Sequence, residues 1–529
     1  MTTLAMRPDE GPTGPGASDN SPRGCRHDFG SHALFPLPLL PAPPGLGHSG
    51  GRRRRWGEHD AVLRETNKTV KSLNWMHGHR HGSGSYEATG DQSHVLARVW
   101  GLHSSRRPPA DAPCEEAALK KLLKGRSIYC TDLAGRNIAT FRPGAVSLPD
   151  HIHDARALDE LVGSEMHKVL EGGMKRMGAE VVNFSDLPCA YWDPTLRGKT
   201  YVAFLKDLDG RGLLQFTLHK KEEAGIFFVS KKSGALRLIL DGRRGNKHLA
   251  RPPHVSLATV EAFSNAEVEP PEEYSQDAEG ARQFLKDEGL YVGTADVMDC
   301  FHRLRIPLWL AELYCLRPVP AWQLGLQGKI ISGAVVERDT VVYPCPATLP
   351  MGCSWSVAFC QDIGEKQAAK VRGLKEARRI SDRGDRLLLA RFPGGRAADS
   401  QMYYYVYVDN LGVISLHAES VVQSLADLAS HFNGIGLKIH DLEVHHVKAN
   451  ILGVSLDLKE GHSQITDERF FALRSGIRAL IRRGRCSGQA LEVLVGHLTY
   501  AGLSNRGCLT MLNGVYKFIH QFYFSAGRL

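Results

Sequence analysis

Residues 402–410 read Met-Tyr-Tyr-Tyr-Val-Tyr-Val-Asp-Asn, an apolar, aromatic run that ends in Asp409 and Asn410. Aromatic and β-branched residues in such a run favour a β-strand. Far upstream, the apolar segment that ends in Thr294-Ala295-Asp296 also delivers a carboxylate. Two strands that each carry an Asp at a strand-to-turn junction can hold divalent metal ions between them, as a two-metal phosphoryl-transfer site requires. The sequence therefore predicts that Asp296 and Asp409 meet on neighbouring strands.

The size and composition of the chain set broad limits. A length of 529 residues leaves room for roughly two to four domains, and an apolar content of 42% supports at least one sizeable core. Lys and Arg number 66 against 57 Asp and Glu, which gives a net charge of +9. This modest excess is compatible with a polyanionic partner but does not demand one.

Cysteine usage and hydropathy bear on the compartment. The 11 Cys form no C-x-x-C pair and no Cys/His cluster at zinc spacing, so we expect buried thiols in a reducing environment. No apolar run approaches the roughly 20 residues of a membrane span, and the proline-broken run at 33–41 is a poor signal peptide. We therefore expect an intracellular protein, in the cytoplasm or the nucleus, with no membrane partner.

Composition and periodicity divide the chain into segments. Residues 1–150 carry much of the Gly, Pro, Ser and His, so we expect a disordered or low-complexity arm there. Apolar residues at helical spacing between Asp159 and Met177 predict a helical lead-in over 151–224. In the segment 225–460, two strands are expected at 225–230 and 236–241, joined by a hairpin turn. Residues 461–529 are expected to form a helical C-terminal segment.

A third pattern lies between the two carboxylates. Residues 349–356 read Leu-Pro-Met-Gly-Cys-Ser-Trp-Ser, a glycine turn that opens a helix. Carboxylate, glycine turn and aromatic-x-Asp, in this order, resemble the palm of reverse transcriptases of retroelements. The resemblance covers roughly 225 to 455. It implies an α+β fold shaped as a right-hand polymerase, with fingers and palm over 225–460 and a helical thumb or connection segment over 461–529. The palm of such a fold is an antiparallel sheet backed by helices, and the N-terminal arm precedes it.

The first palm motif begins at Asp296 and resembles the family pattern Asp-x-x-x-small-aromatic. The resemblance implies that Asp296 is a catalytic metal ligand. Phe301 falls on the aromatic position that packs where a ribose 2′-hydroxyl would sit. A bulky ring there implies deoxynucleoside triphosphates (dNTPs) as substrates.

The second and third motifs follow along the chain. Residues 349–356 match the family's Leu-Pro-Gln-Gly motif, with Met351 in place of Gln and Gly352 where the backbone must pass close to template-primer and nucleotide. The stretch from Tyr407 to Asn410 matches Tyr-x-Asp-Asp. Asp409 takes the first metal-ligand position and Asn410 the second, where the family has a carboxylate. Because an amide oxygen brings no charge, metal affinity is expected to be lower.

A basic segment upstream resembles the fingers hairpin of the family, Lys-Lys-x-Gly, then Arg, then Asp-x-Arg-x-x-Asn. The resemblance implies that Lys231 or Lys232, together with Arg237, contacts the incoming triphosphate. The residues that would hold the fingers and the template strand are Asp241, Arg243 and Asn246. Further along, Lys438 matches a lysine near the leaving pyrophosphate.

The resemblance implies an RNA-directed DNA polymerase that uses two Mg²⁺ ions, or Mn²⁺ in their place, and binds an RNA or DNA template-primer with dNTPs. Asn410 and Met351 leave a second hypothesis open, a catalytically degenerate reverse-transcriptase-derived protein that still binds nucleic acid. An RNA-dependent RNA polymerase is disfavoured because Phe301 would crowd a 2′-hydroxyl. With no ribonuclease H or integrase pattern after 455, we expect a fragment of a longer polyprotein or a domesticated remnant.

Overall fold

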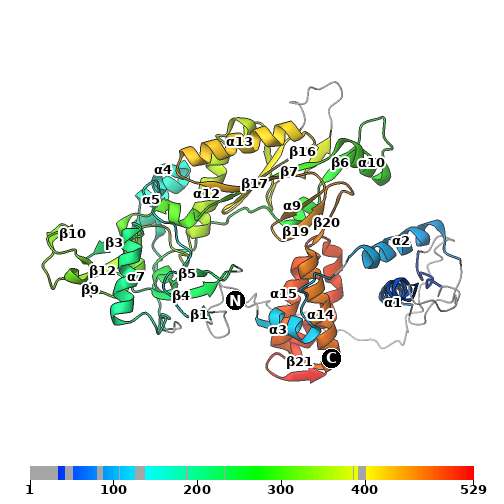
Figure 1. The fold of residues 1–529 in the computed structure, drawn as a ribbon, viewed down its shortest axis with the longest axis horizontal. Coiled ribbons are helices and arrows are strands. Elements are labelled where there is room, and N and C mark those ends of the chain that lie inside the picture. Colours follow the sequence, from blue (N-terminus) through cyan, green and yellow to red (C-terminus); the bar gives the residue numbers. More distant parts are fainter. Residues whose placement is uncertain are drawn as a thin grey trace, which may run out of the picture. The chain divides into compact units, whose positions relative to one another are not determined.

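The computed structural model describes residues 34–41, 52–79, 87–106, 108–124, 138–185, 187, 189–231, 233–384, 386–390 and 401–528. The chain forms two compact units, Met1–Pro108 and Pro109–Leu529. Figure 1 shows a mixed α/β protein in which several small sheets and one larger sheet are accompanied by helices.

The first unit corrects part of the prediction for residues 1–150. Its described residues include two helices, α1 (Arg52–Met76) and α2 (Gly90–Ser105). Leu37, Val70 and Leu96 form a small buried core, and buried Asn74 accepts from the Leu37 amide and donates to its carbonyl. Averaging composition over 150 residues hid the helical spacing of the few apolar residues in α1, which is why a disordered arm was expected here.

The central sheet of the second unit has the strand order β13-β15-β16-β7-β17. The four strands from β15 to β17 pair antiparallel, and the short edge strand β13 pairs parallel with β15. The bounds are β13 Arg378–Arg379, β15 Tyr403–Tyr407, β16 Asn410–Ser415, β7 Tyr291–Val297 and β17 Ile439–His445.

Both faces of this sheet are covered. Tyr404 and Val406 belong to the main hydrophobic core, together with residues of α12 (Ser356–Ala368) and α13 (Ala418–Gly434). Tyr403 and Tyr405 belong to a second core with residues of α9 (Val260–Ser264) and α10 (Ala278–Glu288). Since successive side chains of a strand point to opposite faces, burial on both sides explains why the run at 402–406 is apolar at every position.

Two further sheets have three strands each, and the first of them contains the predicted hairpin. The strand pair expected at 225–230 and 236–241 is confirmed as β4 (Gly225–Ser230) and β5 (Leu236–Asp241), and it is extended by β1 (Ile138–Ala139). A neighbouring sheet has the order β3-β12-β9. The bounds of its strands are β3 Leu214–Thr217, β12 Val341–Pro346 and β9 Val319–Pro320.

The helical spacing between Asp159 and Met177 corresponds to three short helices, followed by a longer one. Gly163, Gly172 and Gly173 interrupt the segment, which is why one continuous helix does not form. The bounds are α4 Leu158–Leu161, α5 Ser164–Glu171, α6 Met174–Met177 and α7 Gly198–Gly210.

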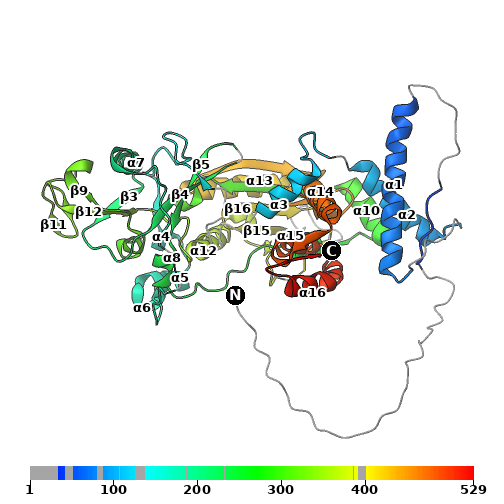
Figure 2. The same cartoon turned by 90° about the horizontal axis from the view of Figure 1, so that it is seen from below.

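The C-terminal region is helical, as predicted. The helices α14 (Asp467–Arg483), α15 (Gly488–Gly502) and α16 (Asn513–Gln521) share a core with α3 (Glu115–Lys124), and Figures 1 and 2 show them gathered in one bundle. A three-stranded sheet precedes them, with strands β18 Lys448–Ile451, β19 Val454–Asp457 and β20 His462–Ile465.

None of the described helices combines the length and the apolar composition that crossing a membrane requires.

The remaining elements are short. The other bounds are β2 Arg156–Ala157, α8 Arg243–Lys247, β6 Glu267–Glu269, η1 Cys300–Arg303, β8 Leu304–Arg305, α11 Leu308–Ala311, η2 Glu312–Tyr314, η3 Ala321–Leu324, β10 Ile330–Ile331, β11 Ala334–Val335, η4 Arg372–Leu374, β14 Leu388–Ala390, β21 Arg485–Ser487, η6 Arg506–Leu512 and β22 Ala526–Arg528.

Candidate functional site

The two carboxylates of the sequence analysis lie on adjacent strands. Asp296, near the end of β7, is the register partner of Asn410 in β16, and the amide of Val297 donates to the Asp409 carbonyl at 2.9 Å. Burial, and after it the negative charge of Asp409, raise the pKa of Asp296 to about 6. The structure therefore brings Asp296 and Asp409 together across the strand pair, as the sequence predicts.

The turn that presents Asp409 is tight and strained. It joins β15 to β16 with only Val408 and Asp409 between the paired residues Tyr407 and Asn410. Val408 has a φ of 59°, which is uncommon for a β-branched residue. A backbone in this conformation persists only where its surroundings hold it.

Gln361 of α12 supplies that hold, and the sequence analysis missed it. Its side-chain oxygen accepts from the Val408 amide at 2.9 Å, and its nitrogen donates to the Val406 carbonyl at 2.9 Å. The helix can approach the strand closely because Gly364 has no side chain. A Cβ at this position would lie 2.6 Å from a methyl group of Val406. A polar residue within the apolar run after the glycine turn was the available signal.

Asn410 occupies the position where the resemblance implies a second carboxylate. Its side-chain nitrogen donates to Asp409 Oδ1 at 2.9 Å. The amide therefore orients the neighbouring carboxylate and adds no negative charge to the site. Tyr407 pairs with Asn410 at the base of the turn and is half-buried.

His440 of β17 is a second residue that sequence reasoning missed. It is the register partner of Asp296 on the other side of β7, and its ring nitrogen lies 2.9 Å from Asp441 Oδ2. The charge of His440 lowers the pKa of Asp296, whereas that of Asp441 raises it. The site therefore combines three acidic side chains with one histidine.

The donor set suits a cation that brings some of its own ligands. Among the described residues, no group of three or more His, Cys, Asp and Glu is arranged to hold a metal ion. Mg²⁺, however, is commonly bound by one or two carboxylates together with water and substrate phosphates. Asp296 and Asp409 provide those two carboxylates, and the mutual repulsion that raises the pKa of Asp296 is relieved by a cation.

Phe301 follows the end of β7 in the sequence, and Lys438 lies beside that end through a backbone hydrogen bond. Phe301 lies in η1 and is partly buried against the main core. The Lys438 carbonyl accepts from the Met298 amide at 2.8 Å, which places the lysine beside the end of β7. Its ammonium group lies 3.0 Å from Asp154 Oδ2.

Asp154 joins two cations on this side of the site. Besides Lys438, buried Arg303 donates to Asp154 at 2.6 Å. Burial alone would raise the pKa of Asp154, but the hydrogen bond from Lys438 and the charge of Arg303 outweigh it and leave the pKa below its usual value. Lys438 is therefore held by an ion pair.

The basic residues of the β4–β5 hairpin lie at and near its turn. Lys231 donates to the Ser147 hydroxyl at 2.7 Å, and Arg237 is exposed. Lys231 also contributes to lowering the pKa of His302 to about 4, an effect caused mainly by burial. Lys232 lies outside the described residues.

Asp241 and Arg243 form an internal ion pair at the base of this hairpin. Asp241 is buried, and Arg243 donates to both of its oxygens, at 2.7 and 2.6 Å. Burial would raise the pKa of Asp241, but the hydrogen bonds from Arg243 and from the Tyr191 amide lower it below the usual value. This ion pair anchors the base of the hairpin.

Asn246 connects the hairpin to the glycine turn. Its side chain donates to the Gly352 carbonyl at 2.8 Å and accepts from the Tyr314 hydroxyl at 2.7 Å and the Ser354 amide at 2.8 Å. Met351 is half-buried, and its carbonyl accepts from the Leu240 amide at 3.1 Å.

Gly352 is required by two features of this turn. Its φ is 137°, and a Cβ at this position would overlap the carbonyl oxygen of Leu240. Glycine is therefore the residue that lets the turn pack directly on β5. The predicted glycine turn and the predicted hairpin form one packed unit.

Comparison with known proteins gives limited further information. No family model matches the sequence, and no curated protein matches it. Among solved structures, the chain is similar to a foamy viral protease-reverse transcriptase in complex with double-stranded DNA, with 14% identity and a TM-score of 0.38. The similarity covers 72% of this chain and 58% of the length of that one. At these values the similarity assigns no family, so the functional argument rests on the site itself.

Proposed function

We propose that this protein is an RNA-directed DNA polymerase of retroelement origin that transfers deoxynucleotides to a primer 3′-hydroxyl. The observation that carries the proposal is the meeting of Asp296 and Asp409 on adjacent strands, close enough for one charge to raise the pKa of the other carboxyl group. In the right-hand arrangement implied by the sequence, the central sheet is the palm, the β4–β5 region the fingers and the C-terminal helices the thumb.

Asp296 and Asp409 would hold Mg²⁺, with the amide oxygen of Asn410 as a neutral neighbour. When bound, two such ions lower the pKa of the primer 3′-hydroxyl and neutralise the departing pyrophosphate. In the reaction, the primer oxygen forms a bond to the α-phosphorus of the dNTP as the bond to pyrophosphate breaks. Asp296 must be ionised for this role, and a bound cation would favour the ionised form because it relieves the repulsion from Asp409.

The basic side chains around the carboxylates would bind and orient the triphosphate. Arg237 is exposed, and within the described part of the chain the Lys231 ammonium group is bonded only to a neutral hydroxyl, so both can turn toward phosphate oxygens. Lys232 would join them. Lys438 would lie near the leaving pyrophosphate after exchanging its pairing with Asp154 for a phosphate.

Primer extension on poly(rA)/oligo(dT) with dTTP tests the proposal directly. We expect incorporation by the wild-type protein in Mg²⁺ or Mn²⁺, and its loss in Asp296→Ala and in Asp409→Ala. The surface variant Asp427→Ala, on α13, serves as the matched control because it removes a carboxylate away from the β7–β16 strand pair. Incorporation that survives in both active-site variants would contradict the assignment of these residues.

Phe301→Val tests the substrate class. If the ring excludes a 2′-hydroxyl, the smaller side chain should raise ribonucleotide incorporation tenfold or more relative to dNTP incorporation. An unchanged ratio in a variant that still uses dNTPs would remove Phe301 from the proposed site.

A second candidate function is binding of nucleic acid without catalysis. The observation that favours it is the hydrogen bond from the Asn410 amide to Asp409, which occupies one carboxylate oxygen and supplies no charge. Asn410→Asp distinguishes the two functions: a polymerase with weakened metal affinity should incorporate nucleotides at lower Mg²⁺ after this change. Template binding without incorporation in either metal, in the wild type and in Asn410→Asp, would favour the second function.

A further inference from the structure

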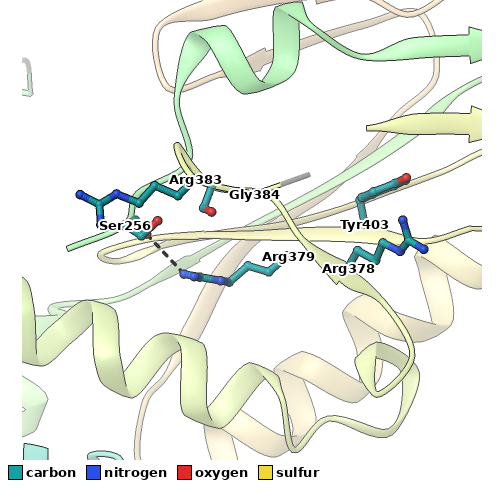
Figure 3. A pocket seen from close by; sticks show the side chains of 7 residues that line it. Ser256, Arg378, Arg379, Arg383, Gly384 and Tyr403 are labelled. Carbon is teal, nitrogen blue, oxygen red and sulfur yellow. Dashed lines mark hydrogen bonds between the residues drawn. The ribbon is translucent and has the colours of Figure 1, made fainter. Parts of the chain in front are cut away.

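An arginine-lined cavity of about 620 Å³ lies at the β13 edge of the central sheet. Arg378 and Arg379 of β13, Arg383 of the following turn, and the hydroxyl-bearing Ser256 and Ser381 line it. In Figure 3, Arg379 and Arg383 lie on the side of Ser256, whereas Arg378 lies beside Tyr403. The cavity therefore presents cationic side chains at both of its ends.

The three arginines differ in how much of their charge is available. Arg379 is paired with Glu365 and also donates to the Ser256 carbonyl at 3.3 Å. With the Gln401 amide turned so that its oxygen faces the guanidinium, Arg378 donates to that oxygen at 3.2 Å. A neutral amide orients Arg378 without neutralising it.

Arg383 is exposed, and among the described residues it forms no ion pair. One acidic residue lies close by: Asp382 accepts a hydrogen bond from the Ser256 hydroxyl and lies 3.8 Å from His254. Arg379 is therefore a structural cation, whereas Arg378 and Arg383 retain charge that a ligand can use.

The cavity offers no surface on which a base could stack. Its aromatic lining residue, Tyr403, has an exposed fraction of 1%, and its hydroxyl is bonded to the amide and the carbonyl of Leu388. Base-stacking sites need an exposed aromatic face. The lining therefore suits the charge of phosphate groups and does not read bases.

The position of the cavity relates it to the carboxylates. Arg378 pairs in register with Tyr403, and Tyr403 precedes Asp409 by six positions along the β15 strand and its turn. At a rise of about 3.3 Å per residue, this corresponds to about 20 Å. A strand of nucleic acid that occupies the carboxylate site can extend over that distance within a few nucleotides.

We propose that Arg378 and Arg383 form a second phosphate-binding site, which holds the sugar-phosphate backbone of a nucleic-acid strand at a distance from the carboxylates. This inference rests on the proposed function, because it takes the ligand to be the template-primer. Arg383, with its flexible exposed side chain, contacts one phosphate, and Arg378 contacts another. Such contacts add affinity without sequence preference.

The salt dependence of template-primer binding tests the site. Labelled poly(rA)/oligo(dT) is titrated with protein at several salt concentrations, and binding is followed by fluorescence anisotropy. Each phosphate contact contributes roughly 0.7 to 0.9 to the slope of log affinity against log salt. We expect Arg378→Ala/Arg383→Ala to reduce this slope by about 1.5, and Arg378→Lys/Arg383→Lys to retain most of it.

Arg386→Ala is the matched control, because Arg386 belongs to the same segment, pairs with Glu267 and does not line the cavity. It should leave the slope unchanged, and thermal unfolding shows whether each variant is folded. Equal slopes for Arg386→Ala and the double alanine variant would overturn the proposal. A cavity that binds only small phosphates would also overturn the proposal. In that case pyrophosphate binding would depend on the arginines, whereas the salt slope of template-primer binding would not.

Incorporation is measured on the same preparations. If the wild type incorporates nucleotides but the double alanine variant keeps the wild-type slope, the second site fails and the polymerase function stands. If the slope depends on the arginines but no preparation incorporates nucleotides, the second site stands and the polymerase function fails.

Discussion

Two hairpins of the second unit carry Asp409 and the basic residues Lys231 and Arg237 of the candidate site, and they are built differently. The carboxylate hairpin, β15–β16, closes with two residues, and Gln361 holds its strained turn from a buried position. The basic hairpin, β4–β5, closes with the five residues 231–235, and the described residues of its turn are bonded within the turn and to two upstream side chains, those of Arg142 and Ser147.

The difference shows how each hairpin would serve nucleotidyl transfer. Metal-binding carboxylates must be placed to within a fraction of an ångström. A strained turn that is fixed by a hydrogen-bond partner from another element meets this requirement. Cations that follow a triphosphate into the site need freedom to move, and Arg237 is accordingly exposed. The comparison predicts that interference with the carboxylate hairpin reduces activity most strongly.

Among substitutions outside the metal-binding carboxylates, Gln361→Leu should have the largest effect. It leaves the Val408 amide and the Val406 carbonyl without their partner, at about 1–3 kcal/mol for each group that stays buried and unsatisfied. Because a misplacement of about 1 Å can cost roughly 100-fold in rate, we expect incorporation to fall tenfold to 100-fold. Primer extension, corrected for the folded fraction, measures the change.

Gln367→Leu provides the comparison on the same helix. Gln367 is also buried and donates to a backbone carbonyl, that of Leu161, away from the turn. It should lower stability by a similar amount and leave incorporation per folded molecule near the wild-type value. Equal losses of activity in the two variants would show that Gln361 acts only through stability.

Gly352→Ala should have the next largest effect, on stability. The new methyl group would overlap the Leu240 carbonyl, and the φ of 137° is strained for any L-residue. We expect the free energy of unfolding to fall by about 3 kcal/mol or more, as measured by chemical denaturation.

Gly234→Ala supplies the contrast within the basic hairpin. Gly234 also has a positive φ, of 84°, but a Cβ there would meet open space. Only the backbone strain remains, so the expected loss is about 1 kcal/mol. A loss at Gly234 as large as that at Gly352 would show that the tip of this hairpin is as constrained as its base.

Asp296→Asn tests whether burial and the charge of Asp409 penalise the ionised Asp296 carboxylate in the metal-free protein. A carboxyl group whose pKa is raised on folding binds more protons in the folded state, so its contribution is present below about pH 4 and is lost as the pH rises through about 6. The variant should therefore be more stable than the wild type at about pH 7, by about 1–2 kcal/mol after screening by solvent. At about pH 4 the two should be equally stable.

Chemical denaturation without divalent metal measures this difference, with Asp427→Asn on α13 as the control. Asp296→Asn should abolish incorporation while it stabilises the protein. A variant that is no more stable than the wild type at neutral pH would contradict a raised pKa of Asp296 in the folded protein.

The elements with strong local signals could be predicted from the sequence. Two segments have a composition typical of strands and turns: the aromatic run at 402–406 with the carboxylate after it, and the lysine-glycine turn of the basic hairpin. The strands on either side of these turns could therefore be predicted. The meeting of Asp296 and Asp409 on adjacent strands was predicted from two apolar runs that each end in an Asp and from the order of the motifs. The short helices after Asp159 were predicted only as helical spacing, because glycines determine where they break.

The supporting residues could not be predicted, because their roles arise from contacts between distant segments. Gln361 is one of several polar residues of α12, and its role appears only when β15 packs against the helix. His440 faces Asp296 only because of a register shift in β17 between His440 and Glu443. Arg378 and Arg383 lie in a polar segment whose cavity appears only when β13 joins the edge of the sheet.

Asp154→Asn should have the smallest effect on stability. It tests whether the ion pair with Asp154 restricts the Lys438 side chain. Lys438 is held by Asp154, unlike Lys231, whose partner is neutral. The substitution keeps an oxygen for Arg303 and removes the charge, so we expect stability at neutral pH to fall by about 0.5–1 kcal/mol. Because the pKa of Asp154 is lowered on folding, its contribution is present above its unfolded pKa of about 4 and is lost as the pH falls through the folded value. The difference between variant and wild type should therefore shrink below about pH 4, as chemical denaturation would show.

If release of Lys438 also lowers the KM for dTTP, the ion pair competes with the triphosphate. An unchanged KM would mean that Lys438 is no freer in the variant, and that the contrast between a held and a free lysine has no bearing on nucleotide binding.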